Sequence, residues 1–289
     1  MSEKISIDYV QLDKLIELAL NEDLGELGDT TSKAVIPEGT KAVAVFKIKE
    51  DAVVAGLDVA QRVFSVVDPE IEFTPLCSEG AELKCGDVFA EIKGDAQSLL
   101  TAERTALNFI QRLSGVATSA KKYTDALGDS DTKILDTRKT TPGWRNLEKY
   151  AVAVGGATNH RIGLYDRVMI KDNHRALAGL EGDGGITRSV DRVRKMYPQL
   201  EIEVEADSLD EVAEAAEAGA DYILLDNMTN EQMTEAVKIV AGRSKLEASG
   251  GITIGRIPSI AQIGVDFISV GALTHSVKAV DISMEIKLS

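Results

Sequence analysis

Basic side chains concentrate in one stretch of an otherwise acidic chain. The 289 residues carry a formal net charge of -15, yet eight Lys or Arg residues stand against three acids between Arg138 and Arg175. Glycines and the turn sequence Thr-Pro-Gly at 141–143 interrupt this stretch, and such residues suit loops that approach a ligand closely. Because guanidinium and ammonium groups form charge-assisted hydrogen bonds to carboxylates and phosphates, the stretch predicts a pocket for a small, multiply negative ligand.

Five side chains within this stretch are the candidates for binding the ligand. Four carry fixed positive charges, and one is an imidazole whose charge changes near neutral pH, a combination that suits two carboxylates. A solvated turn or a structural histidine would explain any one of them, so the hypothesis rests on the set. The five are Arg138, Lys139, His160, Arg161 and Lys171.

Two acids, Glu205 and Asp226, end successive apolar runs. Carboxylates that meet at the ends of adjacent parallel strands can ligate Mg²⁺, accept ribose hydroxyls or stabilise a cationic transition state. Glu203 would point the same way as Glu205 on an ideal strand and competes for the role. The alternative is that the two acids only neutralise Lys139 and Lys171.

Glycine-rich turns follow the last two apolar runs. The first is Ser249-Gly250-Gly251, and the second contains Gly271. Backbone N–H groups in such turns, together with a helix N-terminus, bind phosphate. His275 follows the second turn and either assists there or caps a helix. The predicted phosphate site therefore consists of Ser249, Gly250, Gly251, Gly271 and His275.

The elements that must position these residues alternate between strand and helix after Gly115. Glu205, Asp226, Ser249 and Gly271 follow one another at intervals of 21, 23 and 22 residues, close to the minimum for one strand–helix unit. Such units in series form a parallel sheet that commonly curls into a barrel, with the active site at the carboxyl ends of the strands. Capping signals at 208–211 and 229–232 and the glycine at 219 mark helices between the strands. The six apolar runs are 133–136, 168–171, 202–205, 222–226, 246–249 and 267–271.

Residues before Gly115 have a different pattern. Helical periodicity up to about residue 25 precedes strand-like sequence at 41–94, which contains a short helix at 60–67. The segment 79–94 resembles the turn-and-strand pattern of lipoyl-carrier domains, but it lacks the hairpin lysine that those domains modify, so we interpret it as scaffold. A helix at 98–113 follows, with its apolar residues on one stripe.

The composition excludes several classes of function. We expect no signal peptide, because the first 25 residues have neither an apolar core nor a small-residue cleavage site. We expect no membrane span, because no apolar run approaches the roughly 18 residues that a span requires. The pI of about 4.7 argues against general binding to nucleic acid or to anionic membranes. The two cysteines, Cys77 and Cys85, make neither a disulfide framework nor a metal cluster, which indicates a reducing, cytoplasmic location.

These motifs, in this order, resemble the quinolinate phosphoribosyltransferase family. The resemblance covers nearly the whole chain. It is carried by GDTT at 28–31, ERTALN at 103–108, DTRKTTPG at 136–143, NHR at 159–161, IKDNH at 170–174, EVE at 203–205, LDN at 225–227 and SGGI at 249–252.

The resemblance implies an α/β fold of two domains. An N-terminal α/β sandwich is expected at residues 1–115 and an incomplete α/β barrel, like that of type II phosphoribosyltransferases, at 116–274. The segment 275–289 is expected to return to the first domain. The family forms a homodimer, or a larger assembly of dimers, with shared active sites, and Arg104 matches the arginine that it delivers across the subunit interface.

The reaction implied by the resemblance joins quinolinate to phosphoribosyl pyrophosphate. It yields nicotinate mononucleotide, pyrophosphate and carbon dioxide for NAD biosynthesis. Glu205 and Asp226 are expected to stabilise positive charge on the ribose and to contact Mg²⁺, directly or through water. Mg²⁺ and Lys139 are expected to neutralise the leaving group. The residues expected to hold the two pyridine carboxylates are Arg104, Arg138, His160, Arg161 and Lys171.

Two departures from the family pattern precede the Asn-His-Arg motif. Ala157 stands where the family often has a third glycine, and Ala153 where it commonly has arginine. If position 157 required a positive φ, alanine would cost about 1–2 kcal/mol.

Two rival functions have distinct requirements. A phosphoribosyltransferase of the same fold acting on nicotinate would need fewer cations in the acceptor pocket. A non-catalytic barrel that binds a phosphorylated metabolite would be expected to lack Lys139, Glu205 or Asp226, and all three are present.

Overall fold

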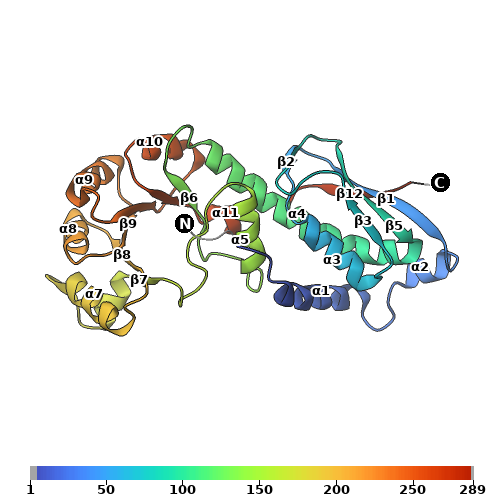
Figure 1. Cartoon of the computed structure of the whole chain (residues 1–289), viewed down its shortest axis with the longest axis horizontal. Coiled ribbons are helices and arrows are strands. Elements are labelled where there is room, and N and C mark those ends of the chain that lie inside the picture. The colour runs from blue at the N-terminus through green and yellow to red at the C-terminus, as the bar shows by residue number, and fades with distance from the viewer. Residues whose placement is uncertain (1–4, 288–289) are drawn as a thin grey trace. The chain divides into compact units, whose positions relative to one another are not determined.

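The structure, a computed structural model, describes residues 5–287. The expected N-terminal domain (1–115) includes residues 1–4 and the expected C-terminal segment (275–289) includes residues 288–289, and these lie outside the described residues. The chain forms two compact units (Figure 1). Of the described residues, the N-terminal unit comprises 5–121, Thr141–Gly156 and 273–287, and the barrel unit comprises Lys122–Thr140 and Ala157–Ala272.

This division differs from the single barrel segment expected at 116–274, because residues 141–156 pack in the N-terminal unit. The reason is a close approach of two helices, α5 (Arg145–Val154) and α4 (Ala96–Asp125). Gly155, the residue after α5, lies against the backbone carbonyl of Ala117 in α4, where any side chain would collide.

An antiparallel sheet forms the N-terminal unit, in the order β12-β1-β5-β3. The last strand of the chain, β12, pairs with β1 along its length. Strands β2 and β4, which alternate along the sequence with β1, β3 and β5, form a separate antiparallel pair. The strands are β1 (Lys41–Ile48), β2 (Ala52–Val53), β3 (Glu72–Pro75), β4 (Glu82–Leu83), β5 (Val88–Asp95) and β12 (Ile282–Lys287).

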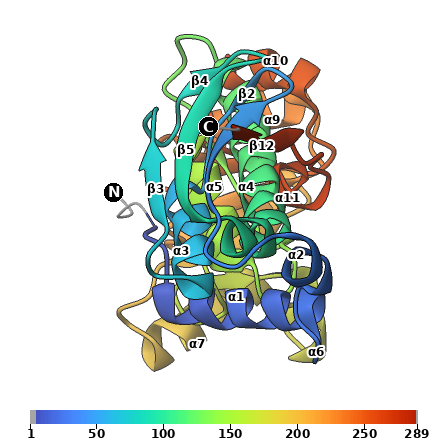
Figure 2. The ribbon, with the colours of Figure 1, turned by 90° about the vertical axis from the view of Figure 1, so that its right-hand side faces the viewer.

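Helices α3 and α4 pack on this sheet (Figure 2). Their apolar stripes meet buried strand residues, and Phe46 at the centre contacts the rings of Phe64, Phe73 and Phe89 at 5.8–6.0 Å between centroids. The helices of the unit, besides α4 and α5, are α1 (Tyr9–Leu24), α2 (Thr30–Val35), α3 (Leu57–Val67) and α11 (Ala272–His275).

The expected helices near 1–25, 60–67 and 98–113 are confirmed, but α4 continues twelve residues beyond the predicted end, to Asp125. Gly115 does not interrupt the helix. Its missing side chain instead makes room for the backbone at Lys278, whose carbonyl would collide with a Cβ at position 115.

Six parallel strands form the sheet of the barrel unit, in the order β6-β11-β10-β9-β8-β7. Each falls on one of the six predicted apolar runs, so the mixed α/β fold is confirmed. Strand β6 ends beside an isolated bridge between Leu135 and Thr158, and β6 and β7 are not paired with each other, which leaves the barrel incomplete within the described residues. The strands are β6 (Lys133–Leu135), β7 (Val168–Ile170), β8 (Ile202–Ala206), β9 (Tyr222–Asp226), β10 (Lys245–Ser249) and β11 (Phe267–Ser269).

The connecting helices begin and end where the sequence signals predicted. The Ser208 side chain accepts the N–H of Glu211 at the start of α8 (Leu209–Glu217), and Thr229 and Gln232 form a capping box at α9 (Asn230–Val240). Gly219, at φ +76°, allows the Schellman turn that ends α8. The others are α6 (Asp172–Leu177), α7 (Gly185–Met196), the 3₁₀ helix η1 (Ile254–Arg256) and α10 (Ile257–Ala261). Among residues 5–287, no helix has both the length and the apolar character needed to cross a bilayer.

Candidate active site

The inner face of the parallel sheet carries acids in two layers. Strand register pairs Glu205 with Leu224 and Asp226 with Ser249, so both carboxylates point to the same face near the carboxyl ends of their strands. Glu203 and Glu247 share this face one layer deeper, and both are fully buried. The burial separates the two competing residues: Glu205 lies near the opening, and Glu203 lies in the barrel core.

Lys171, directly after β7, forms an ion pair with Glu205. This contact is the neutralisation that the sequence offered as the alternative role for the acids. Asp226 differs, because its carboxylate accepts a hydrogen bond from the side chain of Asn227 at 2.8 Å. The two acids therefore have different partners, one a cation and the other a neutral amide.

Two guanidinium groups, those of Arg138 and Arg161, lie close enough for their charges to repel. Burial, followed by the charge of Arg138, lowers the pKa of Arg161 below its ordinary value. The Nε of Arg138 is buried without a hydrogen bond to any residue that the structure describes. Arg161 is held by the backbone carbonyl of Arg167 at 3.0 Å. Like charges brought together in this way favour binding of an anion between or beside them.

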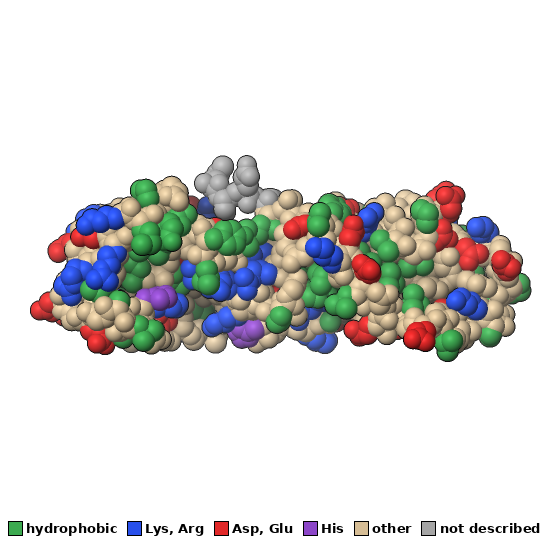
Figure 3. Space-filling model, turned by 90° about the horizontal axis from the view of Figure 1, so that it is seen from below, with side chains coloured by type: hydrophobic (Ala, Val, Ile, Leu, Met, Phe, Trp, Pro, Cys, Tyr) green, Lys and Arg blue, Asp and Glu red, His purple; other side chains and the backbone are tan. Residues whose placement is uncertain are grey.

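Lys139 is exposed on the same loop as Arg138, and its N–H donates to Thr137 Oγ1 at 3.1 Å. In the space-filling view, Lys and Arg side chains gather with a His side chain on one face of the barrel unit (Figure 3).

Asp136 anchors the Asn-His-Arg loop to the end of β6. Its fully buried carboxylate accepts the side-chain N–H of Asn159 at 2.8 Å and the backbone N–H of His160 at 2.7 Å. The sequence reasoning left Asp136 out of the site, although an acid at the end of the first barrel strand, directly before Thr-Arg-Lys, was a signal for it.

His160 is buried, at 7 % exposure, and its ring faces two acids. Its Nε2 lies 3.2 Å from Glu203 and 3.3 Å from Glu247. Burial alone would lower the pKa of His160, but the close carboxylates of Glu203 and Glu247 outweigh burial and raise the pKa to about 9. Burial, together with the nearby charge of Glu247, raises the pKa of Glu203.

One contact opposes protonation of this ring, since the N–H of Arg161 points at Nδ1 at 2.7 Å. A neutral hydrogen bond contributes about 0.5–1.5 kcal/mol, whereas one to a charged partner contributes about 1.5–3. With two carboxylates facing Nε2, we expect the charged ring to prevail.

The same three side chains are close enough to share a cation, because their ligand atoms lie within 4.8 Å of one another. In the charged ring, however, Nε2 carries a proton and has no lone pair to offer a metal. We therefore interpret His160, Glu203 and Glu247 as a proton-sharing cluster. Glu205 and Asp226, with oxygen ligands nearer the opening, are better suited to Mg²⁺.

The turn Ser249-Gly250-Gly251 requires its glycines. Gly250 and Gly251 have φ values of +88° and +57°, and a Cβ on Gly250 would lie 2.9 Å from the backbone N of Asn227. Asn227 itself has a φ of 55°, uncommon for a residue with a side chain. Its N–H donates to the carbonyl of Ser249 at 3.0 Å. This hydrogen bond and the close approach of Gly250 to Asn227 join the predicted phosphate turn to the end of β9, which carries Asp226. Gly271 lies between β11 and α11.

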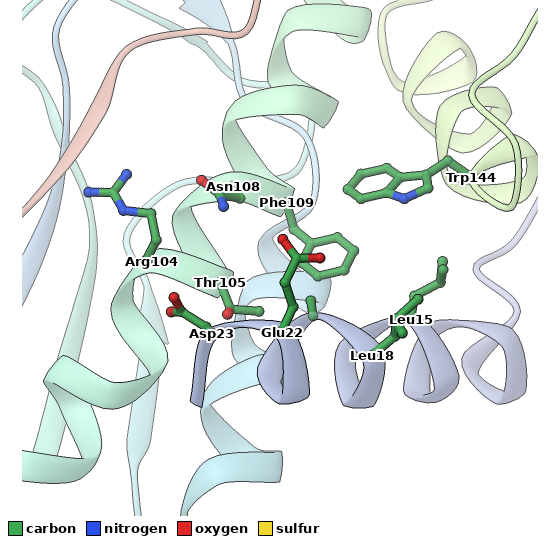
Figure 4. A pocket seen from close by; sticks show the side chains of 10 residues that line it. Leu15, Leu18, Glu22, Asp23, Arg104, Thr105, Asn108, Phe109 and Trp144 are labelled. Atoms are coloured by element: carbon green, nitrogen blue, oxygen red, sulfur yellow. The ribbon is translucent and has the colours of Figure 1, made fainter. Parts of the chain in front are cut away.

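The remaining predicted residues, Arg104 and His275, belong to the N-terminal unit. His275 is exposed at the end of α11, with Nδ1 2.6 Å from Ser276 Oγ. Arg104 is exposed on α4 and lines a cavity of about 270 Å³ between α1 and α4 (Figure 4). The Trp144 ring, stacked on Phe109 at 4.7 Å, lines the same cavity. Sequence reasoning gave Trp144 no role.

The two departures from the family pattern have no strained backbone. Ala157 is buried and does not have a positive φ; Gly156, one residue earlier, has a φ of +89°. The cost considered for alanine at position 157 therefore does not arise. Ala153 lies within α5.

Comparison with known proteins agrees with this arrangement. The family model of the quinolinate phosphoribosyl transferase N-terminal domain matches residues 29–114, and that of the C-terminal domain matches residues 116–285. The mitochondrial quinolinate phosphoribosyltransferase (decarboxylating) 2 of Nicotiana glauca is 43% identical, over 95% of this chain and 82% of its own length. The probable nicotinate-nucleotide pyrophosphorylase (carboxylating) of Bacillus subtilis is 42% identical, over 98% and 96%.

A solved structure shares the fold throughout. The nicotinate-nucleotide pyrophosphorylase of Francisella tularensis superposes with a TM-score of 0.92 at 39% identity, covering 99% of this chain and 100% of its own. With both family models matched in order along the chain, this protein belongs to the quinolinate phosphoribosyltransferase family.

Proposed function

We propose that this protein transfers the phosphoribosyl group of phosphoribosyl pyrophosphate to quinolinate. The products are nicotinate mononucleotide, pyrophosphate and carbon dioxide, in NAD biosynthesis. The observation that carries the proposal is that the barrel unit holds both the repelling pair Arg138 and Arg161 and, at the carboxyl ends of β8 and β9, the acids Glu205 and Asp226. One group suits a dianionic acceptor, and the other suits a cationic sugar.

The acceptor is held by positive charge. Arg138, Arg161 and Lys171 would bind the two carboxylates of quinolinate and orient its ring nitrogen toward the sugar. Binding of the acceptor would relieve the repulsion between the two guanidinium groups, and Lys171 would exchange its contact with Glu205 for the substrate. His160, with its ring held by Glu203 and Glu247, would fix the position of the loop that carries Arg161 from the side of the barrel core.

The acids would act on the sugar as the bond to pyrophosphate breaks. Positive charge then develops on the ribose, and the carboxylates of Glu205 and Asp226 would stabilise it. Glu205 becomes available for this when Lys171 turns to the acceptor. Lys139 would neutralise pyrophosphate as it leaves, and Ser249, Gly250, Gly251 and Gly271 would bind the 5′-phosphate.

Mg²⁺ is the cofactor that fits this set of ligands. It prefers oxygen ligands and commonly uses one or two carboxylates together with substrate phosphates, which Glu205 and Asp226 match. When bound, it would neutralise phosphate charge. Once the pyridine nitrogen is alkylated, its positive charge stabilises the electron pair that stays on the neighbouring ring carbon as carbon dioxide leaves, and a proton from solvent then takes the place of the lost carboxylate.

The family resemblance supports a homodimer, or a larger assembly of dimers, in which Arg104 of one subunit completes the site of the other. The exposure of Arg104 beside a cavity in the N-terminal unit is consistent with that role. His275 is assigned to phosphate on the same basis. The two cysteines are free in the structure, which supports a reducing, cytoplasmic location.

The test is a substrate comparison. Purified protein with Mg²⁺ and phosphoribosyl pyrophosphate is incubated with quinolinate or with nicotinate, and nicotinate mononucleotide and carbon dioxide are measured. Product from quinolinate alone is expected. Product from nicotinate alone would assign the protein to the rival enzyme, and no product from either would favour the binding module.

The acid pair needs a separate test. Glu205→Ala and Asp226→Ala should each reduce turnover strongly while the protein stays folded. Near-wild-type turnover in both variants would show that the assigned acids are wrong.

A further inference from the structure

A partly buried ion pair joins helices α4 and α5 in the N-terminal unit. Glu148, in α5, is fully buried, and its Oε1 accepts from Arg112 Nη2 at 2.6 Å and Nε at 3.2 Å; the Arg112 side chain is 26% exposed. Removing the charge of Glu148 from water is costly, and the cost is offset only when its hydrogen-bonding groups find partners. The other partners of this pair therefore indicate what the pair holds in place.

Those partners belong to two other segments of the chain. Glu148 accepts the backbone N–H of Thr141 at 3.0 Å and its hydroxyl at 2.8 Å. Arg112 donates to the backbone carbonyls of Thr274, in the last turn of α11, at 2.7 Å and of Val277 at 3.3 Å. The two side chains thus fix the loop that begins at Thr141 and the segment 274–277 together.

Both segments adjoin residues of the proposed site. Thr141 is the first residue after the chain leaves the barrel unit, and Thr274 is the second after it leaves again. Lys139 lies two residues before Thr141, and His275 directly follows Thr274. Lys139 and His275 are the side chains proposed for pyrophosphate and phosphate.

We propose that Arg112 and Glu148 are positioning residues for phosphoribosyl pyrophosphate. They set the backbone that carries Lys139 and His275, and neither needs to touch a substrate. The quinolinate side of the site is held by other contacts, such as that of Asp136 with the loop at 159–160. This inference rests on the proposed function.

Two variants test the pair. Glu148→Gln keeps the shape but turns an N–H₂ group toward the N–H groups of either Arg112 or Thr141, so at least one hydrogen bond is lost. Arg112→Lys keeps the charge but cannot reach Glu148 and the two carbonyls at once, because lysine lacks the planar fork. A variant that fails to fold leaves the other to decide the question.

The chain offers a matched control in the barrel unit. Glu214 accepts the backbone N–H of Thr187 at 2.9 Å and its hydroxyl at 3.2 Å, the same two donors that Thr141 offers to Glu148, but here both bonds end at one carboxylate oxygen. Thr187 adjoins none of the proposed site residues. Because a glutamine could keep both bonds through its carbonyl oxygen, the control is Glu214→Ala, which removes the bridge without disturbing the Lys139 or His275 segments.

The measurements are kcat and KM for each substrate, the Kd of phosphoribosyl pyrophosphate with Mg²⁺ by calorimetry, and the unfolding midpoint. Glu148→Gln and Arg112→Lys should weaken the binding of phosphoribosyl pyrophosphate, raising its KM and Kd by about tenfold to a hundredfold. This is the range for losing one hydrogen bond to a charged group, such as that proposed from Lys139 to pyrophosphate. KM for quinolinate should change less than about threefold. Glu214→Ala should lower the unfolding midpoint and leave the binding of both substrates unaffected.

The proposal is overturned if the two variants lose stability like Glu214→Ala while the affinity for phosphoribosyl pyrophosphate is unchanged, or if the binding of both substrates is weakened equally. The proposed function fails separately. A wild-type protein that binds phosphoribosyl pyrophosphate but does not convert quinolinate would refute the reaction, and the Kd values would still test the positioning pair. A wild-type protein that does not bind phosphoribosyl pyrophosphate would refute both.

Discussion

The turn after β10 offers a matched pair of substitutions that differ in one physical respect. Gly250 and Gly251 both have left-handed backbone, at φ +88° and +57°. Alanine at either position is expected to cost about 1–2 kcal/mol for that conformation alone. At position 251 the nearest atom to a new Cβ is Arg256 Nη1, at 3.8 Å, so no further cost arises.

At position 250 the new Cβ would lie 2.9 Å from the backbone N of Asn227 and would collide with its side-chain amide. Forcing such a contact typically costs about 1–3 kcal/mol. Gly250→Ala should therefore lower the free energy of unfolding by about 2–5 kcal/mol, and Gly251→Ala by only about 1–2 kcal/mol. Urea denaturation of the two variants beside the wild type measures both values.

The collision at position 250 should also lower the proposed activity. The amide of Asn227 donates to the carboxylate of Asp226, so a displaced Asn227 releases that acid and turnover of Gly250→Ala should fall. Equal losses of stability in the two variants would refute the reasoning, because the contact with Asn227 would then have no energetic effect. Unchanged turnover in Gly250→Ala would refute the link to Asp226.

Three further outcomes are expected. The pKa of His160 is raised from 6.5 to about 9. Its charged form therefore stabilises the fold fully below about pH 6.5, and this contribution is lost as the pH rises to about 9. Denaturation at several pH values should show the loss in the wild type and a flatter profile in His160→Gln. Ser208→Ala, which removes the cap of α8, should cost about 1 kcal/mol, and an unchanged unfolding free energy would contradict the capping role. Chelation of divalent cations should abolish turnover, with Mg²⁺ restoring it in an assay of pyrophosphate release.

Local signals predicted the barrel elements well. Each barrel strand is an apolar run ended by a polar residue, and the caps at Ser208 and Thr229 depend on residues only three positions apart. The predicted end of α4 was wrong because Gly115 was interpreted as a break. Gly115 instead allows close packing against the backbone of Lys278, which is distant in sequence. Such close approaches leave no periodic signal.

The candidate site was predictable in its residue types and only partly in its arrangement. Alternation along β8 indicated that Glu203 and Glu205 share a face, but not that one is buried beside His160 while the other contacts Lys171. Those contacts depend on which strands become neighbours. The Arg112 and Glu148 pair was invisible for the same reason, since its partners come from three distant parts of the chain.

The pairing of β1 with β12 has a consequence for how the protein is made. Strand β1 ends at Ile48, and its neighbour begins only at Ile282. At ribosomal rates of about 5–20 residues per second, one edge of β1 waits on the order of 10–50 s for its partner. During that time its N–H and C=O groups resemble an exposed sheet edge, which can pair with other chains. Nascent chains stalled before residue 282 should therefore aggregate more readily, or recruit chaperones more strongly, than chains released complete.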